Sequence, residues 1–596
     1  MKKFKKFFAA LMCMQVLVLF AFNSTVSADS VLPEDETSGT LTLYKSIPEN
    51  GKEVDEQEPV SGAGFTAYQI AGLTSDGKYV VTENFKTVSG LSNLFTADGG
   101  LTYQSTSDLE TLIPSLQEKS ENVSNGANGR VYTSSEDGVK AGKYVFGEME
   151  LGIYLVVETT VPNDFITTSQ SFLVSIPEWI EEHEENNVKV EGKWNYDVTA
   201  YPKNEQMVVD KKIANSDGDV SEDTKAIGDT VPFKITAKVP DYGVSTADST
   251  KKVTSLLSND QFNGIKFNFA DILSTGLTLD INSVKVSVLD NDGTELTTLT
   301  KKDSTNNIIK TKSDAGINGN ADYTVETSPA AGGQKLSVDI AWAALDQYQG
   351  KTIELTYSAV LNEKAVIGAE NKNTVKLTYT NDPTVDNSTP TTGGSETKVY
   401  TYGMNLTKYF NNELKSTGAD GVEFSLKKDG NKLWFITKSG EKNGEYIAYS
   451  KKMTEAGTEP AEGTKVTING TAYTITQKLN CSPAGVLNVY GLNIGEYVLT
   501  EEKSISGYSK LASDVTIVVN KDAASAKKVV AAMNNTRLEN KNDNDGVFIL
   551  TVNNVSKQFN LPLTGGTGLL LFTIGGGIIM AGAIIIFYQM RKKKVS

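Results

Sequence analysis

Short runs of alternating apolar and polar residues recur along this chain and constrain its fold more than any other feature. Period-two alternation places successive side chains on opposite faces of a strand, and Gly, Asn, Asp and Ser between the runs are typical of turns. Helical periodicity is confined to brief segments, 108–119 and 340–348. Many short strands predict an all-β chain of tandem Ig-like β-sandwich domains. The clearest runs are 41–44, 231–239, 353–357, 375–379 and 515–519.

Both ends of the 596-residue chain are hydrophobic and flanked by basic residues. Four lysines and an apolar stretch at 7–22 precede Val26-Ser27-Ala28, a pattern typical of a secretory signal peptide that ends at residue 28. An apolar run at 567–588 is long enough to span a bilayer as a helix, and the basic cluster at 591–594 indicates its cytoplasmic side. The region between the two ends is therefore expected to be exported.

The exported region is long enough for several domains. One strand motif ends and another begins near residue 204, and the segment 381–396 is rich in Pro, Thr, Gly and Ser. We therefore predict three Ig-like domains, followed by a sorting signal, a transmembrane segment and a basic tail. The predicted boundaries are 1–28 for the signal peptide, 29–204, 205–390 and 391–560 for the domains, and 561–596 for the tail.

Charge and residue usage exclude several functions. The net charge is −16 although both ends are basic, so the exported part is strongly acidic and nucleic acid is not an expected partner. Removal of the signal peptide leaves Cys481 alone, so no intrachain disulfide is expected. The single histidine, His183, lies in an acidic run, which argues against a histidine-centred catalytic or metal site. We predict a non-enzyme without cofactor or metal; an acidic loop at 215–219 leaves calcium open.

Each predicted domain opens on a strand that carries a lysine and closes on a strand that ends in an asparagine. In the second domain, alternation puts the lysine on the face of Val209 and Ile213, which we expect to point inward. A buried lysine is costly, and desolvation lowers the pKa of its amine toward the neutral, nucleophilic form. The lysines are Lys45, Lys211 and Lys408, and the asparagines are Asn204, Asn381 and Asn554.

A neutral amine pressed against a carboxamide can form an amide and expel ammonia if a buried acid assists the proton transfers. We therefore predict the crosslinks Lys45–Asn204, Lys211–Asn381 and Lys408–Asn554. Asn553 remains an alternative to Asn554, because strand register decides which of the two points inward. Formation of the bond in the first domain also remains open.

Two strings supply candidate acids, YLVVET at 154–159 and YVLTEE at 497–502. They resemble the E-box (YxLxET) of sortase-assembled pilins, whose glutamate assists an intramolecular Lys–Asn isopeptide bond. The resemblance implies this role for Glu158 and Glu501, although Val156 and Glu502 depart from the pattern. In related pilins the corresponding acid of the second domain is an aspartate, and Asp271 matches it by alternation.

Two further strings carry a resemblance to the same proteins. Leu561, Pro562, Leu563, Thr564 and Gly565 resemble the LPxTG sorting signal of Gram-positive surface proteins, in which a sortase cysteine attacks the threonine carbonyl. The string WNYDVTAYPK resembles the pilin motif WxxxVxVYPK, whose lysine accepts the acyl group of another subunit. Its motif residues are Trp194, Val198, Tyr201, Pro202 and Lys203, and Ala200 stands where the motif has Val.

Over its whole length the chain resembles SpaA/SpaH-type backbone pilins, which have CnaB- and CnaA-type Ig-like domains. The resemblance implies a structural subunit of a wall-anchored pilus, polymerised head to tail by joining the Thr564 carbonyl to Lys203 of the next subunit. Implied partners are further copies of the chain, pilin-specific and housekeeping sortases, minor pilins and peptidoglycan. A host-surface ligand is left open, and the alternative function is a monomeric wall-anchored adhesin or a minor pilin.

Overall fold

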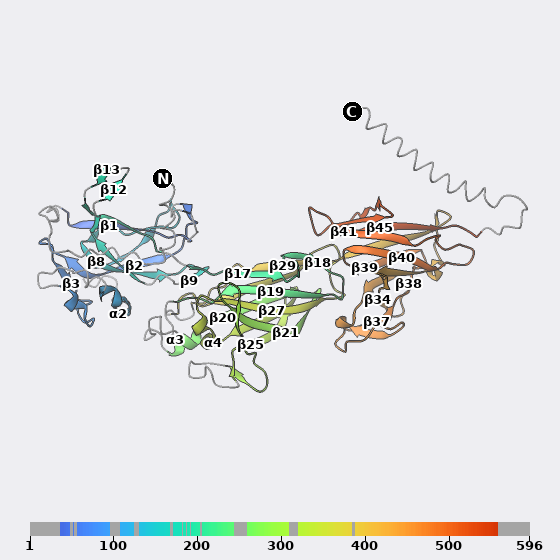
Figure 1. Cartoon of the computed structure of the whole chain (residues 1–596), viewed down its shortest axis with the longest axis horizontal. Helices are drawn as coiled ribbons and strands as arrows, with labels where there is room; N and C mark the ends of the chain where they lie inside the picture. The colour runs from blue at the N-terminus through green and yellow to red at the C-terminus, as the bar shows by residue number, and fades with distance from the viewer. Residues whose placement is uncertain are drawn as a thin grey trace, which may run out of the picture.

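A computed structural model describes residues 36–557 of the chain apart from twelve short segments. Figure 1 shows three groups of β-sheets in a row, coloured from blue at the N-terminal group to orange-red at the C-terminal group. The predicted signal peptide and the sorting signal, with its apolar run at 567–588, lie outside the described residues. The segments left out are 48–51, 53–55, 96–107, 124–129, 167–170, 181–182, 186–187, 191, 203–204, 243–258, 309–319 and 384–387.

The first domain packs two main sheets face to face. One has the order β15-β1-β6-β5 with β7 on β1, and the other has the order β10-β8-β2-β3 with β4 on β2. The first and last strands, β1 and β15, are parallel neighbours. A second apolar cluster packs α2 and η3 against the outer face of β8. The elements are β1 Ser38–Tyr44, β2 Gly64–Leu73, β3 Tyr79–Val81, η3 Leu91–Leu94, α2 Ile113–Ser120, β4 Val131–Thr133, β5 Ser135–Glu136, β6 Lys143–Val145, β7 Met149–Glu150, β8 Gly152–Thr160, β9 Phe165–Ile166, β10 Phe172–Ile176, β11 Glu178–Ile180, β12 His183–Glu185, β13 Val188–Val190, β14 Lys193–Asn195, β15 Asp197–Ala200 and β16 Glu205–Gln206.

The middle domain is a sandwich of two larger sheets, ordered β17-β19-β27-β21-β22 and β18-β29-β28-β20-β26-β25. Regular alternation of buried and partly buried residues along β19 and β27 puts one face of each strand in the core. The elements are β17 Val209–Ile213, β18 Glu222–Thr224, β19 Thr230–Lys238, α3 Asn259–Gly264, β20 Phe267–Ser274, β21 Leu277–Leu289, β22 Glu295–Thr298, β23 Asn307–Ile308, β24 Asn320–Ala321, β25 Tyr323–Ala330, β26 Gly333–Ile340, α4 Trp342–Leu345, η5 Asp346–Tyr348, β27 Thr352–Leu361, β28 Asn371–Tyr379 and β29 Ser395–Tyr400.

The third domain packs a nine-stranded sheet, β36-β37-β34-β35-β39-β30-β45-β44 with β31 on β30, against the sheet β33-β32-β40-β41-β42-β43 with β38 on β32. As in the first domain, the first and last long strands, β30 and β45, are parallel neighbours. The elements are β30 Tyr402–Phe410, β31 Glu413–Leu414, η6 Ala419–Gly421, β32 Glu423–Lys428, β33 Asn431–Lys432, β34 Phe435–Lys438, β35 Glu445–Ala448, η7 Lys451–Met453, β36 Lys465–Ile468, β37 Thr471–Thr476, β38 Leu479–Asn480, β39 Val486–Leu492, β40 Gly495–Lys503, β41 Val515–Lys521, β42 Val529–Met533, β43 Thr536–Arg537, β44 Asn540–Lys541 and β45 Asn544–Asn554.

The all-β expectation is confirmed, and the expected strands coincide with parts of β1, β19, β27, β28 and β41, except that the run 231–239 extends one residue beyond β19. The two expected helical segments are confirmed: the first holds helix at 108–111 and α2, with a turn at residue 112 between them, and the second holds the pair α4–η5. In the part of the chain that the structure describes, no helix is both long and apolar enough to cross a membrane.

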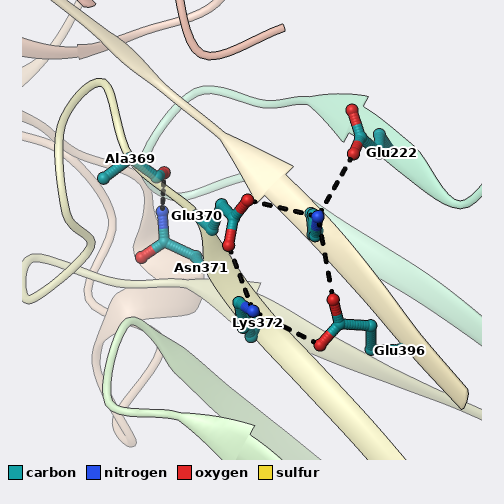
Figure 2. A network of polar contacts seen from close by, with 7 residues as sticks. Glu222, Ala369, Glu370, Asn371, Lys372 and Glu396 are labelled. Atoms are coloured by element: carbon teal, nitrogen blue, oxygen red, sulfur yellow. Dashed lines mark hydrogen bonds and ion pairs between the residues drawn. The ribbon is translucent and has the colours of Figure 1, made fainter.

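The predicted boundary at 390/391 is wrong by about one strand. Strand β29 pairs with β28 and β18 of the middle domain, so this domain extends to Tyr400. Figure 2 shows an ion-pair network across these strands, in which Lys372 contacts Glu370 and Glu396 at 3.2 and 3.4 Å. The segment rich in Pro, Thr, Gly and Ser connects β28 to β29 within the middle domain. Such a composition is typical of loops inside a sandwich as well as of linkers between domains, so it did not identify the boundary. The other boundary shifts by two residues, since β16 pairs with β9 of the first domain.

The middle and third domains meet through closely packed backbone. The amide of Ile227 donates to the carbonyl oxygen of Gly491 at 3.0 Å. A Cβ added to Gly546 would lie 2.0 Å from the Cα of Gly368, and Gly368 has a φ of +67°. Glycine is therefore required here by both the close approach and the left-handed backbone. One apolar cluster accordingly runs through both domains.

Candidate functional site

The three predicted lysines are buried, each beside its predicted acid. The exposed fractions of Lys45, Lys211 and Lys408 are 1%, 0% and 0%. A buried ammonium is strongly disfavoured unless it is paired or loses its proton. The contacts between lysine Nζ and carboxylate oxygen are 2.5 Å for Lys45 and Glu158, 2.6 Å for Lys211 and Asp271, and 3.4 Å for Lys408 and Glu501.

The third domain brings its predicted triad together. Lys408 on β30 and Asn554 on β45 lie on adjacent parallel strands, and Glu501 on β40 faces them from the opposite sheet. The lysine Nζ lies 2.5 Å from Asn554 Oδ1, and Asn554 Nδ2 donates to Glu501 Oε1 at 2.6 Å and to Ser504 Oγ at 2.8 Å. The carboxylate therefore contacts both the amine and the carboxamide.

The register of β45 also distinguishes the two candidate asparagines. Asn554 is 1% exposed and lies in the site. Asn553 is partly exposed, and its Oδ1 accepts a hydrogen bond from the backbone amide of Asn412 at 2.9 Å. Successive residues of a strand point to opposite faces, so only one of the two can reach Lys408.

The middle domain builds its site from two sheets. Lys211 on β17 and Tyr357 on β27 come from one sheet, while Asp271 on β20 and Asn373 on β28 come from adjacent strands of the other. Lys211 Nζ lies 2.6 Å from Asp271 Oδ2 and 2.7 Å from the Tyr357 hydroxyl oxygen. Asn373 Nδ2 donates to the same hydroxyl oxygen at 2.6 Å, and the hydroxyl donates to Asp271 Oδ2.

The predicted pairing of Lys211 with Asn381 is wrong. Asn381 lies eight residues beyond Asn373, at the junction with the first domain, where its Nδ2 contacts the Val161 carbonyl oxygen at 3.4 Å and its Oδ1 accepts from Ser388. Since a strand rises about 3.3 Å per residue, this position is about 25 Å from the site. Asn373 occupies the place that the prediction gave to Asn381.

The first domain repeats the acid geometry of the third. Lys45 directly follows β1, and Glu158 comes from β8 in the facing sheet. Phe65 is paired with Glu158 just as Phe424 is paired with Glu501, each next to a register shift at the start of the strand. The lysine Nζ lies 4.9 Å from the Phe65 ring centroid, within cation–π range. The predicted partner Asn204 lies outside the described residues.

Burial favours the neutral form of each lysine amine. Desolvation lowers the pKa of Lys45 and of Lys408, and the neighbouring glutamates oppose this shift only in part. Desolvation lowers the pKa of Lys211 to about 8, with Asp271 opposing it. An unprotonated amine next to a carboxamide is a nucleophile beside an electrophilic carbon, so the sites of the middle and third domains can support amide formation.

Two site residues of the middle domain, Asn373 and Tyr357, were missed in the sequence. The sequence indicates that both point inward. Asn373 shares a strand face with Val375 and Leu377, and Tyr357 shares a strand face with Ile353 and Leu355. Alternation alone could not select Asn373, since Asn371 shares its face. The structure separates the two: Asn371 donates to the carbonyl oxygens of Val366 and Val399, and Figure 2 shows its contact with the Ala369 carbonyl oxygen.

The pilin-motif residues that the structure describes support a strand end at the edge of the first domain. Trp194 lies on β14, with its ring centroid 5.2 Å from that of Trp179, and Val198 is buried on β15. Tyr201 stacks on Tyr44 at 5.9 Å between centroids, and β15 ends two residues before Pro202. Lys203 and the sorting signal Leu561–Gly565 lie outside the described residues.

The acidic loop at 215–219 contacts neighbouring residues of the middle domain. Asp219 pairs with Lys234, and Asn215 Nδ2 donates to Asp223 at 3.2 Å. Among the residues that the structure describes, no group of three or more His, Cys, Asp or Glu side chains is placed to hold a metal ion.

Two family models and several known proteins are similar to this chain. The SpaA family of prealbumin-like fold domains matches residues 446–535, and the LPXTG cell wall anchor motif matches residues 553–595. The chain is 24% identical over 605 residues to fimbrial subunit type 2 of Actinomyces naeslundii, which covers 94% of this chain and 91% of the relative. It is 22% identical over 435 residues to the trypsin-resistant surface T6 protein of Streptococcus pyogenes serotype M6, covering 68% and 73%.

The solved structure of the full-length major pilin SpaD from Corynebacterium diphtheriae covers 87% of this chain and 98% of its own, with 20% identity and a TM-score of 0.44. The anchor motif places the chain at the cell wall. The anchor motif and the nearly end-to-end similarity to a fimbrial subunit agree with the resemblance to sortase-assembled pilins drawn from the sequence motifs.

Proposed function

We propose that this chain is a structural pilin subunit that a pilin-specific sortase polymerises head to tail. The sortase cysteine breaks the peptide bond between Thr564 and Gly565 and holds the Thr564 acyl group as a thioester. The Lys203 amine of another subunit then attacks the thioester, forms an amide and releases the thiol. Because each subunit offers one acyl group and one amine at different places, repetition gives an open filament.

The observation that supports this polymer is the combination of an anchor motif at 553–595 with a pilin motif at the end of the first domain. The strand β15 stops at Ala200, and Pro202 prevents its continuation just before Lys203. A housekeeping sortase would join the last subunit to peptidoglycan, and minor pilins would add to the fibre. The role is structural, without catalysis on an external substrate.

We further infer that intramolecular isopeptide bonds crosslink the domains. The observation that carries this inference is the contact of 2.5 Å between Lys408 Nζ and Asn554 Oδ1 with Glu501 beside both groups. In the middle domain the bond joins Lys211 to Asn373. Each bond closes a loop of more than 100 residues, for which the chain-entropy model of crosslinks gives about 5 kcal/mol of stability.

In the first domain the bond joins Lys45 to Asn204. The support is a matching count of residues between the two domains. In the third domain Lys408 is paired with Val552, and Asn554 follows two residues later. Continuing the β1–β15 register from Leu43 and Ala200 brings Lys45 level with Pro202, and Asn204 again follows two residues later in the sequence.

The polymer is tested by replacing Lys203 with alanine in a strain that displays the protein. We expect the ladder of high-molecular-weight species on denaturing gels to disappear, while monomer remains attached to the wall. Lys193→Ala is the matched control, because this exposed lysine lies in the neighbouring strand β14. An unchanged ladder in the Lys203→Ala strain would sink the polymer proposal and favour a monomeric wall-anchored adhesin.

A further inference from the structure

The middle and third domains place different groups on the leaving nitrogen of the asparagine. Glu501 uses one oxygen for Asn554 Nδ2, at 2.6 Å, and the other for Lys408 Nζ, at 3.4 Å. Asp271 is one methylene shorter. Only its Oδ2 is engaged, and its buried Oδ1 has no hydrogen-bond partner among the residues that the structure describes.

In the middle domain, the Tyr357 hydroxyl fills the gap left by the shorter acid. Its oxygen accepts from the attacking amine of Lys211 at 2.7 Å and from the leaving carboxamide nitrogen of Asn373 at 2.6 Å, and its proton points to Asp271 Oδ2. A phenolic hydroxyl has one proton to donate and two lone pairs, and these three contacts use all of them. The hydroxyl is therefore held between the two nitrogens that exchange protons.

Burial keeps this hydroxyl protonated. Desolvation raises the pKa of Tyr357 well above its ordinary value, and the nearby Asp271 adds to the effect. The ring also packs beside Phe233, with centroids 5.3 Å apart, so the hydroxyl has little freedom to leave the site. A fixed hydroxyl can accept one proton while it gives up another, without carrying charge of its own.

We propose that Tyr357 is a catalytic residue of isopeptide formation in the middle domain, where it relays a proton between Lys211 and Asn373 together with Asp271. This inference rests on the crosslink proposed above. The neutral Lys211 Nζ attacks Asn373 Cγ and forms the new C–N bond. The proton lost from Nζ passes to Asp271 Oδ2, which Nζ contacts directly, and from Asp271 Oδ2 through the Tyr357 hydroxyl to Asn373 Nδ2. The Cγ–Nδ2 bond then breaks, and ammonia leaves.

The test follows the loss of ammonia in the full-length chain carrying Lys203→Ala, which would remain monomeric. Peptide mass mapping of a pulse-labelled chase gives the rate at which the 211–373 crosslink appears. We expect Tyr357→Phe to slow that rate on the order of 10²-fold, the usual contribution of general acid–base catalysis, and to leave the 408–554 crosslink unchanged. Tyr323→Phe is the matched control, because this buried tyrosine of the same domain donates its hydroxyl to the Val284 carbonyl oxygen on β21, at 3.5 Å.

A second variant separates proton relay from packing. Asp271→Glu added to Tyr357→Phe gives the acid the length that Glu501 has in the third domain, and we expect it to recover at least tenfold of the lost rate. Equal slowing in the single and double variants would assign Tyr357 a packing role and overturn the proposal, as would a wild-type rate in Tyr357→Phe. If the parent chain itself lacks the 211–373 crosslink, the crosslink proposal fails instead.

Discussion

The sites of the middle and third domains bury the same functional groups but take them from different parts of the sandwich. In the third domain the lysine and the asparagine are neighbours within one sheet, on β30 and β45, and the acid comes from the facing sheet. In the middle domain the lysine comes from one sheet, and both the acid and Asn373 come from the other. A crosslink would join the first and last strands in one case and the two sheets in the other.

The two strand arrangements explain why one site uses a glutamate and the other an aspartate. In the third domain Glu501 reaches across the core to a lysine and an asparagine that already touch. In the middle domain Asp271 and Asn373 extend from adjacent strands of the same sheet, so the carboxylate is short and a hydroxyl from the lysine's own sheet completes the contact. The same chemistry is therefore supported by two arrangements of strands.

The largest expected effect is the loss of a crosslink. Asn373→Ala and Asn554→Ala should each show one fewer missing ammonia, measured as the difference between the intact mass and the mass calculated from the variant's own sequence. Each should also lower the unfolding free energy of its own domain by about 5 kcal/mol. The reason is that the unfolded chain regains a loop of more than 100 residues. Calorimetry of the full chain measures this loss of stability, because each domain should give its own unfolding transition.

If Asn373→Ala shows the same number of missing ammonia molecules as wild type, each counted against the mass calculated from its own sequence, the crosslink of the middle domain does not involve Asn373. A transition that moves in the other domain would show that the two sites are not independent, despite the apolar cluster that they share.

A smaller effect is expected in the pH dependence of the uncrosslinked middle domain. In Asn373→Ala, Lys211 stays a buried amine with its pKa lowered to about 8 from 10.5 in the unfolded chain. Between these values the unfolded state binds the proton and the folded state does not, so stability rises with pH, by about 3 kcal/mol across the window. That gain is lost as the pH falls from 10.5 to about 8, and at lower pH both states bind the proton, so Lys211 adds no further pH dependence.

The measurement is the free energy of unfolding in urea at several pH values from 7.5 to about 10.5. The double variant Lys211→Met, Asn373→Ala is the control, since it retains every other titrating group. Plots of unfolding free energy against pH should differ in slope between the two variants only from about pH 8 to 10.5. Parallel plots over that range would show that Lys211 has an ordinary pKa.

The smallest effects are expected at the neighbouring asparagines. Asn381→Ala and Asn553→Ala each remove hydrogen bonds but no reacting group, so each should cost about 1 kcal/mol and leave every crosslink in place. Intact mass and peptide mapping check both. Loss of the Lys408 crosslink in Asn553→Ala, but not in Asn554→Ala, would reverse the register described for β45.

Much of the site could be predicted because it depends on local alternation. Lys45, Lys211 and Lys408 were readable as inward-facing from their apolar neighbours, and so were the acids Glu158, Asp271 and Glu501. The predicted partner of Lys408, Asn554, also lies in the site, and the register of β45 is what distinguishes it from Asn553. The prediction failed at Asn381, because the arrangement of the outer domains was applied to a domain with another topology.

Sequence by itself determined the all-β class, the inward faces of the strands and the six groups of the three lysine–acid pairs. These properties follow from the two-residue period of a strand, which any short stretch of sequence displays. Only the tertiary structure decided that Asn373 rather than Asn381 faces Lys211, that Tyr357 lies between them, and that β29 belongs to the middle domain. Those facts depend on which strands pair and which sheets face each other, and such pairings join residues more than 100 positions apart.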